Sequence, residues 1–335
     1  NSDNFNVENY YKELIEEAKY QQDRLNAFVT ITEDKALSDL EKQDFSHILS
    51  GIPFVAKDNY STKGIATTAS SRMLENYYPI FNAAVIEKLE CAGACLLGKA
   101  SMDELAMGGS NRTALTGPVK NPWDTNRISG GSSGGSAAIV ASGLVPFTLG
   151  SDTGDSIRKP AGYCGVIGFK PTWGRISRYG VVPYASSLDT IGAFSRNVRD
   201  MAIVAEAIAG RDNRDMTSSF NEVPHYLEQL TTDIKGMKIA VPNYFMSDIV
   251  NDEVRKTIES TIEMLKEKGA TVDYVDMKYL DQAVTLYQVI ALGEASSNLA
   301  RFDGIRYGFS YENPENIKDL YLKTRQDGFG TEVKR

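Results

Sequence analysis

Apolar positions in the first hundred residues switch between a helical and a strand-like spacing. Apolar residues recur every three or four positions over 8–24, which predicts an amphipathic helix. Short apolar runs typical of strands follow at 27–31, 52–56 and 95–98, and a helical stretch at 83–92 separates the last two. Because short strands alternate with helices, the pattern predicts an α/β protein with a helix-covered sheet.

The same alternation continues towards the end of the chain. Strands are predicted at 145–149, 237–241 and 271–275, and helices at 133–142, 201–209, 252–268 and 279–300. No internal repeat or low-complexity linker divides these elements, which favours a single domain over 1–335. A further helix begins close to Arg335, so we expect this domain to be incomplete at its C-terminus.

Acidic residues outnumber basic ones, with 44 Asp and Glu against 36 Lys and Arg and a net charge of −8 at pH 7. Nucleic-acid binding by this chain alone is disfavoured, because phosphate contacts require clustered Lys and Arg. A local basic patch or a basic partner would have to supply them. No apolar run approaches the roughly 20 residues that cross a bilayer, so we expect no membrane contact.

The cysteine content argues against both disulfides and a metal site. Three cysteines, Cys91, Cys95 and Cys164, are too few for a disulfide framework and fit a reducing compartment. The spacing of Cys91 and Cys95 would place them on one helical face. They have no nearby histidine and no second cysteine pair, so we expect no metal there.

Two glycine-rich segments each carry a serine on a tight turn. Residues 129–136 are Ser-Gly-Gly-Ser-Ser-Gly-Gly-Ser and include Ser132, and residues 150–158 are Gly-Ser-Asp-Thr-Gly-Asp-Ser-Ile-Arg and include Ser156. Both segments lack the G-x-G-x-x-G and G-x-x-x-x-G-K-[ST] spacings of nucleotide-binding turns. A serine at a strand-to-helix turn can face a ligand together with backbone N–H groups. The two serines therefore form a candidate catalytic site.

A serine nucleophile needs a base, and a lysine is the best candidate in this chain. The two histidines, His47 and His225, lie outside any motif. Lys57 follows directly on the apolar run 52–56, and an amine becomes a competent base once burial lowers its pKa. These residues predict a Ser-Ser-Lys hydrolase.

The lysine and serine segments resemble the amidase-signature family. The resemblance is carried by 51–59 (Gly-Ile-Pro-Phe-Val-Ala-Lys-Asp-Asn) and by both glycine-rich segments. It continues through 165–172 (Gly-Val-Ile-Gly-Phe-Lys-Pro-Thr) and 185–189 (Ala-Ser-Ser-Leu-Asp). It covers nearly the whole chain and implies the family's fold, a central mixed β-sheet covered by helices on both sides.

The resemblance implies a role for each member of the triad. Ser156 matches the nucleophile, Ser132 matches a bridging serine that lies next to an unusual cis peptide in the family, and Lys57 matches the base. A neutral Lys57 amine would take a proton from Ser132, which relays it from Ser156 during attack on an amide carbon. Water would then hydrolyse the acyl-enzyme, and this chemistry requires no metal.

The family's oxyanion hole comes from backbone N–H groups of the turn before the nucleophile, here Thr153, Gly154 and Asp155. The family normally has glycine where this chain has Asp155. A positive φ would suit aspartate poorly, and an inward carboxylate would oppose the oxyanion. Asp155 therefore points to solvent, pairs with Arg158 or another cation, or lowers activity; we expect an outward side chain and a working enzyme. Asp152 and Arg158 are expected to orient the loop.

Substrate-binding positions are implied for Tyr287, Gly108 and Gly109, although Tyr287 is also a candidate core residue. The family's contacts to the α-amino and α-carboxyl groups of glutamine fall at or beyond Arg335. Cys164, eight residues after the nucleophile, fits a buried apolar position better than a second nucleophile.

Within the family, 294–308, 102–108 and 121–124 are most similar to the branch that serves tRNA-dependent amidotransferases. That branch implies hydrolysis of glutamine and delivery of ammonia to a B subunit, which uses ATP and Mg to amidate Glu-tRNA(Gln) or Asp-tRNA(Asn). It also implies a small C-type subunit, tRNA contacts mainly through the partner, and no cofactor in this chain. Bacterial and organellar members share these motifs, so we expect the cytoplasm or an organellar matrix. The alternatives are a stand-alone amidase and a catalytically impaired scaffold subunit.

Overall fold

The computed structural model describes residues 6–335, and the chain divides into two compact units. The first unit comprises Asn1–Leu227 and Gly293–Arg335, and the second comprises Glu228–Leu292. Each unit has its own sheet. The single domain expected from the sequence stays a prediction.

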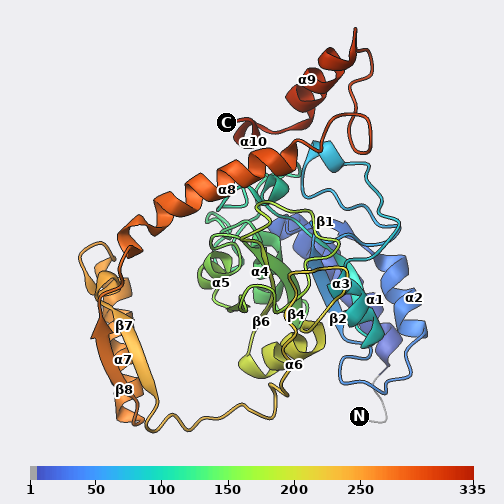
Figure 1. Cartoon of the computed structure of the whole chain (residues 1–335). Helices are drawn as coiled ribbons and strands as arrows, with labels where there is room; N and C mark the ends of the chain where they lie inside the picture. Colours follow the sequence, from blue (N-terminus) through green and yellow to red (C-terminus); the bar gives the residue numbers. More distant parts are fainter. Residues whose placement is uncertain (1–5) are drawn as a thin grey trace. The chain divides into compact units, whose positions relative to one another are not determined.

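A six-stranded mixed sheet lies at the centre of the first unit (Figure 1). Its strands are β1 (Phe28–Ile31), β2 (Pro53–Lys57), β3 (Cys95–Ala100), β4 (Phe147–Asp152), β5 (Ile167–Phe169) and β6 (Thr190–Ser195). They lie in the spatial order β1-β3-β2-β4-β6-β5. β2 runs parallel to both β3 and β4, whereas the other neighbours are antiparallel. The carboxyl ends of β2 and β4 therefore meet at one edge of the sheet, where Lys57 ends β2.

Helices cover both faces of this sheet, and polar residues begin several of them. The helices of the first unit are α1 (Val7–Leu25), α2 (Glu33–Glu41), α3 (Ala84–Cys91), α4 (Gly134–Ala141), α5 (Arg158–Cys164), α6 (Val198–Ile208), α9 (Ile317–Gly328) and α10 (Thr331–Lys334), with short 3-10 turns η1 (Arg72–Leu74) and η2 (Glu104–Ala106). Asn6, Asn197 and Asn316 cap α1, α6 and α9, since each side-chain oxygen accepts a hydrogen bond from a first-turn N–H group.

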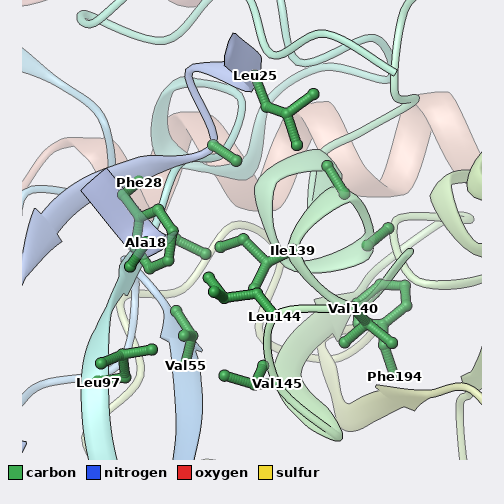
Figure 2. Close-up of a cluster of buried hydrophobic side chains, with 14 of the residues drawn as sticks. Ala18, Leu25, Phe28, Val55, Leu97, Ile139, Val140, Leu144, Val145 and Phe194 are labelled. Carbon is green, nitrogen blue, oxygen red and sulfur yellow. The ribbon is translucent and has the colours of Figure 1, made fainter. Parts of the chain in front are cut away.

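Each face of the sheet has its own hydrophobic core, because successive strand residues point to opposite sides. Val55 of β2 and Leu97 of β3 pack with Ile139 of α4 in a cluster that also includes α1, α2 and α5 (Figure 2). Phe54 and Ala56 of β2 point the other way and pack against α3 and α6. Every residue of β2 is consequently buried, including Lys57 at its end.

The second unit contains a two-stranded parallel sheet and the helix that connects its strands. β7 (Lys238–Pro242) and β8 (Thr271–Val275) pair in parallel, and α7 (Asp252–Glu267) lies between them in the chain. The 3-10 turns η3 (Asn243–Met246) and η4 (Leu280–Gln282) flank these elements. α8 (Ala283–Leu299) begins in this unit and ends in the first.

The predicted α/β class with a mixed, two-sided sheet is confirmed, and most predicted elements are present within a few residues of their expected ends. The sequence did not predict α2, α9, β5 or β6, and the strand expected at 145–149 begins at Phe147. Over residues 6–335, no helix is long and apolar enough to cross a membrane.

Candidate active site

Lys57 and Ser132, predicted as base and bridging serine, are in direct contact. The Lys57 Nζ donates to the Ser132 Oγ at 2.8 Å and to the Ser151 Oγ at 2.9 Å. Ser151 lies near the end of β4, which runs parallel to β2, so its side chain reaches the end of β2. All three side chains are buried. The lysine is therefore held by hydroxyl groups at the edge of the sheet, out of contact with solvent.

The surroundings of Lys57 favour its neutral form. Burial lowers the pKa of Lys57 from 10.5 to about 7, because the charged ammonium loses its hydration. The carboxylates of Asp103, Asp152 and Asp189 act in the opposite direction without cancelling this effect. A substantial fraction of the amine is therefore neutral near pH 7 and available to accept a proton.

The backbone around Ser132 is fixed by glycines and by Asp103. Gly130 has a φ of +77°, a conformation that suits glycine, and the Gly131–Ser132 peptide is cis. A Cβ on Gly131 would lie 2.0 Å from the Asp103 Oδ2, so this position has no room for a side chain. The Asp103 N–H also donates to the Ser132 carbonyl at 3.1 Å. Asp103 thus packs against Gly131 and binds the backbone of Ser132.

Asp103 also organises the loop that contains Gly108 and Gly109, two predicted substrate-binding positions. Its buried carboxylate accepts hydrogen bonds from consecutive backbone N–H groups of residues 110–113. A Cβ on Gly108 would lie 2.5 Å from the Asp103 Cγ, so a side chain there would displace the carboxylate. The structure therefore brings the loop and the Ser132 turn together through one aspartate, and the substrate role of both glycines stays a prediction.

Ser156, the predicted nucleophile, lies in the turn between β4 and α5. Its carbonyl accepts a hydrogen bond at 3.2 Å from the N–H of Ser133, the residue after the bridging serine. The buried Asp152 carboxylate accepts from the Ile157 N–H at 2.9 Å and pairs with the Arg158 guanidinium at 3.0 Å. The Arg158 N–H also donates to this carboxylate, and α5 begins at Arg158, two residues after Ser156.

Thr153, the first predicted oxyanion-hole residue, is fixed by Asp189. The Thr153 Oγ1 donates to the Asp189 Oδ1 at 2.6 Å, and the other carboxylate oxygen accepts from the Tyr184 N–H at 2.9 Å. Burial raises the pKa of Asp189, while these hydrogen bonds favour its ionised form. Asp189 also lines a cavity of about 310 Å³ together with Arg178 and Arg301. The Asp189 side chain therefore connects Thr153 of the predicted oxyanion turn to the lining of this cavity.

Asp155 adopts one of the arrangements that the sequence left open. Neither Gly154 nor Asp155 has a φ in the left-handed region, so aspartate adds no backbone strain here. The Asp155 carboxylate pairs with the Lys159 ammonium at 2.7 Å and is partly exposed. The Arg158 guanidinium, the partner named from the sequence, binds Asp152 and the Gly154 carbonyl instead.

The other candidates are placed as follows. Cys164 is buried in the core, and burial raises the pKa of its thiol to about 12, which fits the apolar role expected for it. Tyr287 is part of the second unit, so its role in substrate binding stays a prediction. Arg335 pairs with Glu332 at 3.0 Å. Across the described part of the chain, no group of three or more His, Cys, Asp or Glu side chains could hold a metal ion.

Three residues of the site were not singled out from the sequence: Ser151, Asp103 and Lys159. Ser151 lies within a quoted motif, but its contact with Lys57 depends on the alignment of β4 against β2. Asp103 lies three residues after the end of β3, at the same sheet edge as Lys57, and this placement was the available signal. Lys159 could have been found from its spacing of four residues from Asp155.

Comparisons with known proteins point to one family. The family model described as Amidase matches residues 9–335. The A subunit of glutamyl-tRNA(Gln) amidotransferase from Sulfurihydrogenibium sp. is 48% identical over 96% of this chain and 68% of the relative. The crystal structure of the corresponding protein from Thermotoga maritima has a TM-score of 0.82 at 41% identity, covering 90% of this chain and 64% of that one.

A more distant likeness connects the chain to amidases of a different kind. The native peptide amidase from Stenotrophomonas maltophilia has a TM-score of 0.81 at 28% identity, covering 98% of this chain and 70% of that one. In these comparisons the chain spans about two thirds of the length of its relatives.

Proposed function

The chain belongs to the amidase family, and we propose that within this family it is the glutaminase subunit of a tRNA-dependent amidotransferase. The observation that carries the proposal is the buried Lys57 amine, hydrogen-bonded to Ser132 and with its pKa lowered to about 7. The proposal for glutamine comes from relatives such as the 48% identical protein, which is named as the A subunit of an amidotransferase.

The proposed reaction begins with proton transfer towards Lys57. The neutral amine accepts the proton of Ser132 as Ser132 accepts that of Ser156, and the Ser156 Oγ attacks the side-chain amide carbon of glutamine. Backbone N–H groups of the 153–155 turn stabilise the oxyanion, each contributing roughly a hundredfold in rate. The proton then returns through Ser132 to the departing ammonia. Water next attacks the glutamyl ester on Ser156 and gives a proton to Lys57 through Ser132, and that proton returns to the Ser156 oxygen as glutamate leaves.

The ammonia would be used by other subunits of the complex. We propose a B subunit that activates Glu-tRNA(Gln) or Asp-tRNA(Asn) with ATP and Mg, and a small C-type subunit. Contact with tRNA would be made mainly through the B subunit, which agrees with the net charge of −8 on this chain. The chain itself would use no cofactor, and the complex would work in the cytoplasm or an organellar matrix.

Two alternatives make different predictions. A stand-alone amidase would hydrolyse small amides without partners. The similarity to the peptide amidase supports this alternative, but that protein is 28% identical to the chain, whereas the amidotransferase relative is 48% identical. A scaffold subunit would have no reactive serine. That alternative is based partly on the Asp155 carboxylate, which would oppose the oxyanion if it were unpaired. The ion pair between Asp155 and Lys159 weakens this argument.

Ammonia release from glutamine tests the proposal, measured with and without the partner subunits for the protein and for Ser156→Ala. We expect release that depends on the partners and falls by at least about a thousandfold in Ser156→Ala. Partner-independent release would favour the stand-alone amidase. Unchanged release by Ser156→Ala would show that another residue is the nucleophile.

A further inference from the structure

We propose that Lys159 is a positioning residue, which neutralises the Asp155 carboxylate and holds it away from the reacting centre. The inference rests on the proposed function in one respect: it requires Ser156 to be the nucleophile. What is new is that the ion pair between Asp155 and Lys159 determines how much negative charge lies next to the oxyanion.

Lys159 holds Asp155 through both its side chain and its backbone. The Lys159 Nζ lies 2.7 Å from the Asp155 Oδ2, and the Lys159 N–H donates to the Asp155 carbonyl at 2.8 Å. Asp155 directly precedes Ser156, and Lys159 lies in the first turn of α5. The pair therefore closes the turn from which the oxyanion donors are expected, and fixes where its one negative side chain points.

The Lys159 ammonium fills a space that Gly109 leaves open. A Cβ on Gly109 would lie 2.5 Å from the Lys159 Nζ, and no other heavy atom comes closer than 3.8 Å to that point. The Lys159 side chain is 29% exposed, less than that of Asp155 at 45%. The Lys159 ammonium therefore lies against Gly109, and a side chain at this position would have to displace the flexible end of the lysine.

The neighbouring arginine cannot replace Lys159 in this role. The Arg158 guanidinium donates to both oxygens of Asp152 and to the Gly154 carbonyl. Removing the Lys159 ammonium would therefore leave the Asp155 carboxylate without an ion-pair contact, attracted by Arg158 only at longer range, beside the charge that develops on the substrate oxygen. One unit charge on the residue next to the nucleophile, with an effective dielectric constant of about 20, changes a rate by roughly 10- to 50-fold.

A purely structural role for the pair would give a different result. Partly exposed ion pairs add little to stability, so losing this one should leave unfolding almost unchanged. The expected effect is on the transition state, since glutamine itself carries no charge on its side-chain amide. It should appear in kcat, with KM within about twofold of the original value.

The test uses the full-length protein with its partner subunits and compares Lys159→Met, Lys159→Arg and the double variant Asp155→Asn with Lys159→Met. Two quantities are measured: kcat and KM for glutamine, and the rate at which a fluorophosphonate labels Ser156. We expect Lys159→Met to lower kcat and labelling roughly 10- to 50-fold, Lys159→Arg to keep most of both, and the double variant to recover most of the loss.

Lys323→Met is the matched control, because Lys323 pairs with Asp319 at the same spacing on α9. It should leave both rates unchanged. Normal rates in Lys159→Met, or an equal loss in the double variant, would overturn the proposal. If the original protein is labelled at Ser156 but releases no ammonia, the glutaminase assignment fails. The proposed role of the Asp155–Lys159 pair is then tested by the labelling rates of the variants alone. Absence of labelling at Ser156 in the original protein overturns the proposed role of the Asp155–Lys159 pair as well.

Discussion

Two buried lysines on neighbouring strands, Lys57 of β2 and Lys99 of β3, have opposite surroundings. Both side chains are completely buried. The Lys99 Nζ lies 3.4 Å from the Asp58 Oδ1 and donates to the Tyr60 carbonyl at 2.8 Å. The Lys57 Nζ instead donates to the hydroxyls of Ser132 and Ser151.

The comparison shows how two completely buried lysines on neighbouring strands can differ in their electrostatic surroundings. Burial lowers the pKa of both amines, but at Lys99 the Asp58 carboxylate opposes this shift at close range. At Lys57 no carboxylate is in ion-pair contact among the described residues, and the pKa falls to about 7. A buried lysine whose contacts are neutral can act as a base, whereas a carboxylate at ion-pair distance favours the charged form of its lysine and opposes that role.

The largest expected effect comes from removing the amine of the first lysine. Lys57→Met should lower kcat for glutamine by roughly 10³- to 10⁴-fold, because the relay from Ser156 loses its acceptor. Ammonia release measures the loss, and thermal unfolding checks that the protein remains folded. Activity above a tenth of the original would mean that another group is the base.

Removing the second lysine should affect stability. Lys99→Met leaves the buried Asp58 carboxylate without its cation, which costs about 3–5 kcal/mol in the free energy of unfolding. Urea unfolding measures this loss, and adding Asp58→Asn should recover most of it, since the buried charge is then removed. A loss below about 1 kcal/mol, or no recovery in the double variant, would contradict the ion-pair account of Lys99.

The pH dependence of glutamine hydrolysis should follow the titration of Lys57. Below pH 7 the Lys57 ammonium cannot accept a proton, so kcat/KM for glutamine should fall about fivefold between pH 7 and pH 6 and level off above pH 8. A pH series of ammonia release measures the midpoint. Equal rates at pH 6 and pH 8 would rule out Lys57 as the titrating base.

Ser151→Ala should give the smallest effect. The Ser151 hydroxyl accepts hydrogen bonds from the Lys57 Nζ and from the Asn59 Nδ2 at 3.0 Å. Loss of an acceptor disfavours the ammonium, so the midpoint of the pH profile should move to lower pH by less than about one unit. The same pH series detects the shift, and a movement to higher pH would mean that Ser151 does not stabilise the charged form.

The sequence predicted the elements that carry strong patterns, and with them the position of the proposed base. The apolar run 52–56 identified β2 and placed Lys57 at its end. β6 was not predicted because all six of its residues are buried, so no alternation marks it, and Gly192 weakens its strand signal.

The contacts between side chains in the candidate site were harder to predict than the candidate residues themselves. The two serines followed from their glycine-framed motifs, and Lys57 followed from the lack of a suitable histidine. The contacts of Ser151 and Asp103 depend on how strands align and loops close, and these come from long-range packing. The partner of Asp155 depends on a turn in which α5 begins two residues after Ser156.

A direct measurement of the Lys57 titration tests the central claim, that burial among hydroxyl groups makes this lysine neutral near physiological pH. Lysine labelled with ¹³C at Cε would be titrated by NMR, with Lys57→Met used to assign the signal. The account predicts a midpoint near pH 7 for Lys57. A midpoint that stays near the ordinary value of 10.5 would contradict it, because the amine would then be charged when the enzyme works.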